Sequence, residues 1–224
     1  MRTLILAIIR PWKLARAVSE GPAWVVPLIV LAVLQIAVAS LVYDRTVGEV
    51  LAGLPDGVSP ADRIAVEKTF QEERTIEVLF KPFRLAAGCA SFSLVVFGLL
   101  QIFFLPVRPR FHHVFSLTVH AELILILGQA GSYIRSLPGL SRSPGMPFSL
   151  NDLFPQASFL GSYVLGSFSL FHFWSLAVLV VGLVGVTKMQ PLKAAAVVLI
   201  SWMLTVALSA WALHSMVSFF HFGL

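Results

Sequence analysis

The chain has 224 residues, of which 58% are hydrophobic and 12% are charged. An ordinary soluble domain has about 25% charged residues. A soluble core of this size could not hide so much apolar surface. The composition therefore excludes an ordinary soluble protein and predicts that lipid surrounds much of the chain. The net charge of +5 is scattered over short polar segments, which argues against a nucleic-acid partner.

The first 21 residues mix basic and apolar side chains, with Trp12 among them. Their apolar run is too short to span a bilayer and is interrupted at Arg10-Pro11. Residues 1–21 are therefore predicted to form an amphipathic helix that lies in the cytoplasmic membrane interface.

Residues 23–43 form the first of five predicted transmembrane helices, because each of five apolar stretches approaches the roughly 20 residues that cross a bilayer. The other four predicted spans are residues 87–105, 114–134, 166–186 and 193–213. Ala37-Val38-Ala39 resembles a signal-peptidase site. The apolar stretch around it is longer than a signal-peptide core, which favours a retained helix over cleavage.

Residues 44–86 are the only long polar segment and are predicted as an outer polar helix and loop. Ser59-Pro60-Ala61-Asp62 has the pattern of a capping box with proline at the first helical position, which predicts a helix from Pro60 to about Lys81. Opposite charges four residues apart, such as Arg63 and Glu67, are typical of a solvated helix face. Docking of a partner on this helix is the alternative.

Residues 135–159 are rich in Pro, Gly and Ser and are predicted as an irregular outer loop. Within it, Ser149-Leu150-Asn151-Asp152 resembles a second capping box that would open a short re-entrant or interfacial helix. On the opposite side, Lys188 and Lys193 lie in the short turn between the last two spans.

A cytoplasmic N-terminus would place one set of the polar segments inside the cell and the other set outside. In the inner set, Lys and Arg are about twice as dense as in the outer set. This asymmetry predicts a cytoplasmic N-terminus and an extracytoplasmic C-terminus. The expected location is a prokaryotic plasma or inner membrane, with the chain crossing it several times.

Several short motifs lie at the ends of these predicted helices and in the third span. They are Arg10-Pro11-Trp12-Lys13 with Gly21-Pro22, His120-Ala121-Glu122-Leu123, Phe168-Ser169-Leu170-Phe171-His172-Phe173-Trp174, Gly182-Leu183-Val184-Gly185-Val186-Thr187-Lys188, and Lys193-Ala194. With them, the chain resembles the short prokaryotic branch of the Yip1 domain family over nearly its whole length. The resemblance implies one five-helix integral membrane domain over residues 1–224. Eukaryotic relatives are implicated in vesicle trafficking and recruitment of small GTPases, but no activity carries over for the prokaryotic branch.

Glu122 is predicted to lie near the middle of the bilayer, about 13 Å from the inner end of its helix. Thr118, Gln129 and Tyr133 share its helix face, because offsets of 4, 7 and 11 residues return to the same side. Candidate partners at similar depth are Gln35, Ser201 and Thr205. An intramembrane carboxyl is by default a candidate proton or cation site. The alternative is a protonated carboxyl that is hydrogen-bonded to a neighbouring helix.

No signature of a hydrolase, a nucleotide-binding loop or a zinc site occurs, so the sequence predicts no catalytic residue, cofactor or metal, and no enzymatic activity. The single cysteine, Cys89, excludes an internal disulfide. His120 lies on nearly the opposite helix face from Glu122 and is not expected to share its site.

Two functions remain open at this point. The sequence favours a membrane organiser or adaptor, which binds membrane lipids and either another membrane protein or further copies of itself. The alternative is a transporter or permease component for a small molecule or ion that uses Glu122 in the bilayer.

Overall fold

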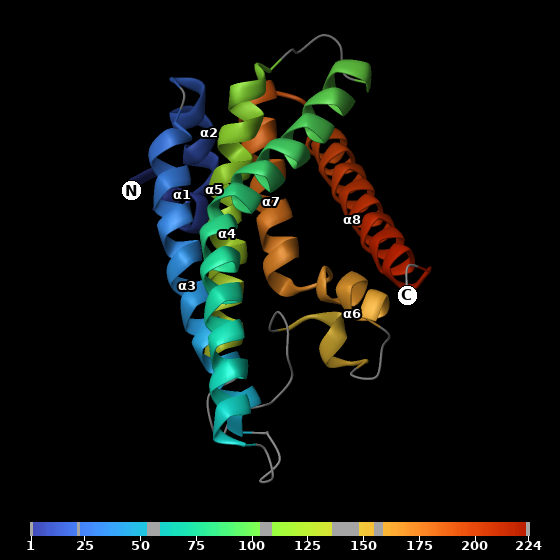
Figure 1. The fold of residues 1–224 in the computed structure, drawn as a ribbon. Coiled ribbons are helices and arrows are strands. Elements are labelled where there is room, and N and C mark those ends of the chain that lie inside the picture. The colour runs from blue at the N-terminus through green and yellow to red at the C-terminus, as the bar shows by residue number, and fades with distance from the viewer. Residues whose placement is uncertain are drawn as a thin grey trace.

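The computed structural model describes residues 2–21, 23–52, 59–103, 109–135, 148–154 and 159–222. Within these ranges the chain is helical, with one 3-10 turn and one isolated β-bridge, so the predicted all-α class is confirmed. The helices are α1 (Arg2–Ile9), α2 (Pro11–Ser19), α3 (Val25–Ala52), α4 (Pro60–Phe103), α5 (Phe111–Arg135), α6 (Phe159–Gly166), α7 (Leu170–Thr187) and α8 (Pro191–Phe222), and the turn η1 is Leu150–Asp152. Figure 1 shows their arrangement.

Four helices, α4, α5, α7 and α8, are long and apolar enough to cross a membrane, which indicates a multi-pass membrane protein. The spans predicted at 114–134 and 193–213 fall on α5 and α8, residues 87–103 of the span predicted at 87–105 fall on α4, and residues 170–186 of the span predicted at 166–186 fall on α7. Residues 104 and 105 lie outside the described residues. The span predicted at 23–43 falls on α3, whose apolar part, Val25–Leu41, is shorter. Four helices of the described chain therefore meet the length and composition that a span needs, and α3 stays a prediction as the fifth.

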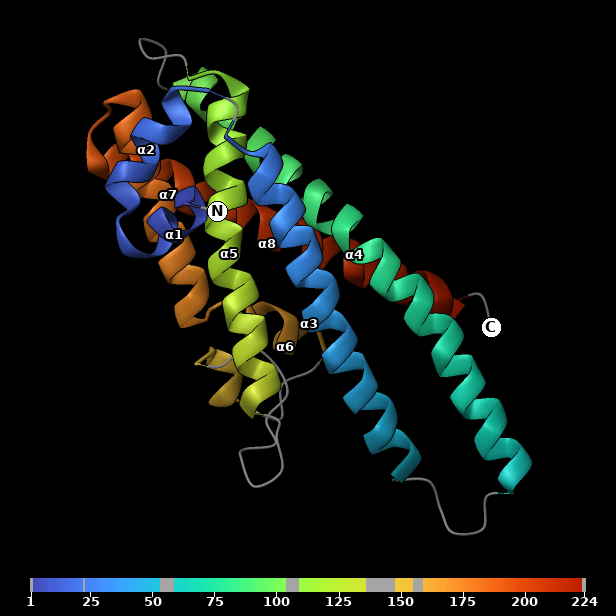
Figure 2. The same ribbon diagram turned by 90° about the vertical axis from the view of Figure 1, so that its left-hand side faces the viewer.

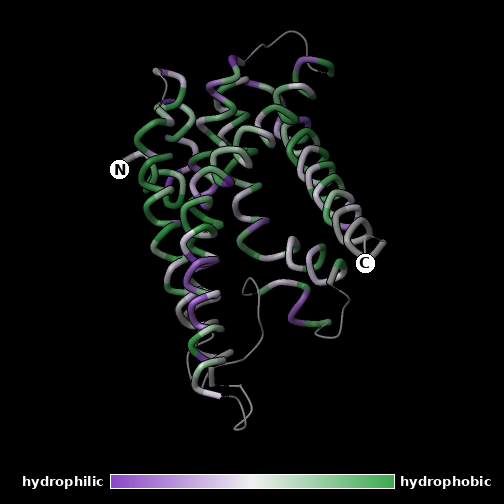
Figure 3. Tube along the Cα trace, viewed as in Figure 1, coloured by the Kyte–Doolittle hydropathy of each residue, from purple (hydrophilic) through white to green (hydrophobic). Residues whose placement is uncertain are grey.

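α4 differs from the prediction, which separated an outer helix ending near Lys81 from a span beginning at residue 87. The structure has one continuous helix of 44 residues with Pro82 inside it. Proline removes one backbone hydrogen bond, but the flanking residues are mostly good helix formers and continue the helix on both sides. Figure 3 shows the consequence, in which hydrophilic residues gather on the half of α4 that follows Pro60.

α3 lies beside the half of α4 that follows Pro60 in both views of the fold, whereas in Figure 1 the other half of α4 runs away from α3 (Figures 1 and 2). α3 continues to Ala52, well beyond the predicted end of its span at residue 43. The Tyr43 hydroxyl donates a hydrogen bond to the carbonyl of Phe70 at 2.9 Å, which joins the extended part of α3 to the polar half of α4. The two polar ends therefore form a helical hairpin.

The N-terminal segment forms two helices, α1 and α2, where one interfacial helix was predicted. The break lies at Arg10, which has φ −144° and ψ 65°, directly before Pro11. Both helices pack against the bundle, α1 against α5 and α2 mainly against α7, and they bury Leu4 and Leu14. Part of the apolar surface of this segment thus contacts protein, whereas Ile5, Ile9 and Trp12 stay exposed.

The α7–α8 hairpin turns where the two lysines were noted. Lys188 has φ 58°, and its N–H donates to the carbonyl of Val184 at 2.8 Å, which closes the C-terminus of α7. Pro191 opens α8. From this turn α7 and α8 diverge (Figure 1). Where α7 and α8 are far apart, α6 packs against α8.

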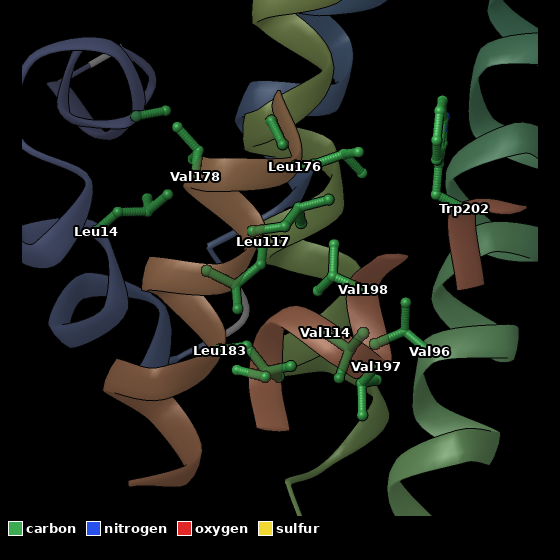
Figure 4. Packing of buried hydrophobic residues seen from close by; sticks show 14 of the residues in the cluster. Leu14, Val96, Val114, Leu117, Leu176, Val178, Leu183, Val197, Val198 and Trp202 are labelled. Carbon is green, nitrogen blue, oxygen red and sulfur yellow. The ribbon is translucent and has the colours of Figure 1, made fainter. Parts of the chain in front are cut away.

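The main apolar core combines residues of α1, α2, α4, α5, α7 and α8. In Figure 4, Leu117 of α5 lies among apolar side chains of α7, near Leu176 and Leu183. A Cβ atom on Gly182 would lie 2.5 Å from Cδ2 of Leu117, so the glycine permits the close contact of α5 and α7. Gly182 and Gly185 thus serve helix packing, as their position in an apolar helix predicts.

Candidate functional site

A cavity of about 240 Å³ lies where α8 diverges from the bundle. Helices α4, α5, α7 and α8 and the region of α6 contribute to its wall. Its polar lining residues are Thr118, Glu122, Tyr163, Ser167, His172, Ser175, Thr205 and Ser209. Its apolar lining consists of Gly88, Cys89, Phe92, Ala121, Leu125, Leu176, Leu179, Trp202 and Val206.

Glu122 supplies the only carboxyl among the described residues that line this cavity. The α-helical spacing of Thr118, Glu122 and Leu125 places all three on the side of α5 that faces the cavity. Within the described chain, no hydrogen bond or ion pair engages the Glu122 carboxyl. The carboxyl is therefore available to a ligand that carries a positive charge or a hydrogen-bond donor.

Thr118, by contrast, is already engaged. Its hydroxyl is buried, donates to the carbonyl of Val114 at 3.1 Å and accepts a hydrogen bond from the Ser93 hydroxyl at 2.9 Å. This bond connects α4 to α5 directly below the cavity wall. Ser93 was not among the predicted site residues, and Thr118 is better described as a residue that positions α5.

His172 enters the cavity because the chain breaks between α6 and α7. Ser169 has an extended backbone, and its hydroxyl accepts a hydrogen bond from the N–H of His172 at 3.3 Å, so it caps α7 three residues later than the predicted start of the span. The same hydroxyl lies 2.7 Å from Nδ1 of the His172 ring and fixes the ring orientation. The Ser-x-x-His spacing is the sequence signal that could have identified this residue.

The segment before α6 supports this break. Leu150 donates its N–H to the carbonyl of Phe168 at 3.0 Å, and Leu170 donates to the carbonyl of Phe148 at 3.2 Å. The helix predicted to start at Ser149 is only a 3-10 turn of three residues, and the Ser149 hydroxyl has no hydrogen-bond partner within the described part. The capping-box prediction is wrong here, because the Ser149 backbone pairs with that of Ser169.

On α8, Thr205 and Ser209 line the cavity one turn apart. The Thr205 hydroxyl donates to the carbonyl of Ser201 at 2.9 Å. Ser201 itself is fully buried, its hydroxyl has no hydrogen-bond partner among the described residues, and it does not line the cavity. Of the two predicted partners on this helix, the structure brings only Thr205 to Glu122's cavity.

The remaining predicted residues lie elsewhere. Gln35 is on α3, where its side-chain oxygen is buried without a partner in the described chain, and it is not part of the cavity lining. Gln129 accepts a hydrogen bond through its backbone carbonyl from Ser132 and does not line the cavity either. The side chain of Tyr133 lies outside the described residues.

His120 is buried, and its Nδ1 donates to the carbonyl of Ser116 at 2.6 Å. It is absent from the cavity lining, in agreement with its predicted position on the other face of α5. Across the residues that the structure describes, no group of three or more His, Cys, Asp or Glu side chains is arranged to hold a metal ion.

The cavity combines one carboxyl, several hydroxyls, an imidazole and the aromatic rings of Phe92 and Trp202. A carboxyl and aromatic rings in one cavity suit a cation, which can gain from the charge and from the ring quadrupoles when water is excluded. The hydroxyls and the imidazole can orient a bound group by hydrogen bonds.

Comparison of the chain with protein families, curated proteins and solved structures gave no match. The resemblance to the Yip1 family stays a prediction from the short motifs quoted above.

Proposed function

We propose that the protein is a five-span membrane protein that binds a small molecule or ion in the Glu122 cavity, as a transporter or permease component. The N-terminus is cytoplasmic, the C-terminus is extracytoplasmic, and α3 is the fifth span. The observation that carries the proposal is a carboxyl without a partner among the described residues, in a cavity between apolar helices.

The energetic cost of placing a carboxyl among apolar helices supports this proposal. A carboxyl in an apolar helix is expensive and is normally hydrogen-bonded to its surroundings. Hydroxyls of Ser175 and Thr205 line the same cavity as Glu122, yet neither hydrogen-bonds to it. The Glu122 carboxyl thus has the position expected of a group that pairs with a ligand entering the cavity.

The test is binding and flux with the full chain in proteoliposomes. A hydrophobic organic monocation such as tetraphenylphosphonium serves as the probe, with inorganic monovalent cations in parallel. The variant Glu122→Gln keeps the size of the side chain and removes its charge. We expect at least a tenfold loss of cation binding and loss of flux in this variant, because the only carboxyl in the described cavity lining is gone.

The control is Glu67→Gln, which removes an exposed carboxyl from the polar half of α4 and should leave both readouts unchanged. Equal binding by the wild type and Glu122→Gln would remove Glu122 from the site. No saturable binding or flux of any tested small molecule or ion would contradict the transporter proposal itself.

The second candidate is the organiser or adaptor, and a separate observation favours it. The polar half of α4 exposes large apolar side chains, among them Ile64 at 66%, Ile76 at 61% and Leu79 at 60%. Part of this half lies outside the predicted membrane span, so lipid does not account for all of the exposed apolar surface. Contact with a second membrane protein or with another copy of the chain would cover it.

This candidate predicts a stoichiometric membrane partner, or a homo-oligomer, when the protein is purified in mild detergent. The double variant Ile64→Ser/Ile76→Ser should release it, whereas Leu204→Ser on the exposed face of α8 should not. Mass spectrometry of the purified complex and light scattering provide the readouts. A wild-type chain that always purifies as a lone monomer would argue against the organiser.

A further inference from the structure

A second concave surface lies at the N-terminal end of the chain, between α1 and α2. This groove has a volume of about 590 Å³ and is separate from the Glu122 cavity. Figure 2 shows the two short helices next to each other on one side of the bundle. Their lining side chains divide into a basic group, Arg10, Lys13 and Arg16, and an apolar group that includes Ile5, Leu6 and Ile9.

The basic group has no partner of its own. Arg10, Lys13 and Arg16 are exposed, and none of them forms an ion pair with a residue that the structure describes. Glu20, also exposed, is the one acidic residue among the described lining of the groove. Three cations against one carboxylate leave the groove with an excess positive charge, which an anion of the membrane surface would neutralise.

The apolar group is exposed as well, since Ile5 and Ile9 are 55% and 63% accessible. A soluble anion would leave these side chains uncovered. A ligand with a negative head and a hydrocarbon tail satisfies both groups at once. Trp12, which is 62% exposed on α2, has the amphipathic ring that favours the headgroup depth of a bilayer.

The groove is also built on a fixed support. The opposite side of α2 buries Leu14, Ala15 and Val18. A Cβ atom on Gly185 of α7 would collide with Cβ of Ala15, so the two backbones are in close contact. This contact fixes α2 beside the last turn of α7, at the end of the bundle where Lys188 lies.

We propose that the α1–α2 groove binds an anionic phospholipid, with its phosphate held by Arg10, Lys13 and Arg16 and an acyl chain along Ile5 and Ile9. The lipid belongs to the leaflet on the side of the α7–α8 turn, which is the cytoplasmic leaflet in the proposed topology. The site does not depend on Glu122 or on transport.

The test uses the full chain in neutral detergent, with native mass spectrometry to count bound lipids during titration with phosphatidylglycerol or phosphatidylcholine. We expect one tightly bound phosphatidylglycerol and at least tenfold weaker binding of phosphatidylcholine. The double variant Lys13→Gln/Arg16→Gln should weaken binding of phosphatidylglycerol at least tenfold. The swap Lys13→Arg/Arg16→Lys keeps the charge and should keep the binding.

The matched control is Arg63→Gln/Lys68→Gln, which removes one Arg and one Lys from the exposed face of α4 and should change the affinity less than twofold. Competition by millimolar inorganic phosphate or glycerol phosphate would show that the groove recognises a free phosphate and would overturn the proposal. The proposal would also fall if the groove and control variants lost lipid equally, or if the groove variant lost none.

Discussion

At the scale of single residues, the closest helix contacts depend on glycine. Gly185 faces Ala15 of α2, and Gly182 faces Leu117 of α5, so α7 can approach two neighbours at positions one turn apart. In membranes, where lipid is as apolar as the helices, association relies on such close packing. The closest approach of α2 to α7 therefore depends on the glycine at position 185.

Gly185→Ala should destabilise the protein, because the new methyl group would overlap with the Ala15 side chain and the α2 backbone would have to move. Overpacking of this kind costs about 1–3 kcal/mol. The midpoint of thermal unfolding in detergent measures the effect. The double variant Gly185→Ala/Ala15→Gly restores the space and should recover most of the loss.

The control for this prediction is Gly98→Ala on α4, where a Cβ would meet no other atom within 4 Å. It should be neutral or stabilising, by up to about 1 kcal/mol from helix propensity. Equal destabilisation by the two single substitutions, or no recovery in the double variant, would show that the contact between Gly185 and Ala15 does not determine the attachment of α2.

The sequence could identify Glu122 and its helix face but not its neighbours. Helical periodicity places Thr118 and Glu122 on one side of α5, and the structure brings both to the same cavity. Their similar depth in the membrane predicted Ser201 and Thr205 equally as partners of Glu122. They lie on one helix, yet only Thr205 reaches the cavity, because the direction in which α8 diverges decides which of its side chains faces α5.

At the scale of helices, the sequence located the apolar stretches but not all of their ends. The predicted boundary between an outer helix that ends near Lys81 and a span that begins at residue 87 is wrong, because α4 continues through Pro82, where one lost backbone hydrogen bond does not end the helix. α7, by contrast, starts later than the span predicted at 166–186. Ser169 caps it within an apolar stretch that hydropathy alone reads as a single span.

The unbroken α4 has a mechanical consequence. Its polar half and its apolar half belong to one helix, so a partner bound near Ile64 could turn the membrane part of α4 together with Phe92, which lines the Glu122 cavity. The Tyr43–Phe70 hydrogen bond ties α3 to the same unit. The two proposed functions are therefore structurally compatible.

At the scale of the whole molecule, the topology depends on whether α3 crosses the membrane as the fifth span. Among the described side chains, the apolar part of α3 covers Val25–Leu41, about 25 Å at 1.5 Å per residue, slightly less than the hydrocarbon thickness of a bilayer. α3 nevertheless lies along α4, which is long enough to cross (Figures 1 and 2). Modest thinning of the bilayer accommodates a short helix at low cost, so α3 can cross beside α4.

With α3 as a span, the α7–α8 turn faces the cytoplasm and the segment around η1 faces outward. Single-cysteine variants test this orientation in a Cys89→Ser background, since Cys89 is the only cysteine of the chain and is buried. Gln190→Cys lies in the exposed turn, and Leu153→Cys lies after η1 at a side chain that is 70% exposed. In intact cells, a membrane-impermeant maleimide should label the cysteine at residue 153 and should reach residue 190 only after lysis. Labelling of residue 190 in intact cells, or protection of residue 153, would invert the proposed topology and move the α1–α2 groove to the outer leaflet.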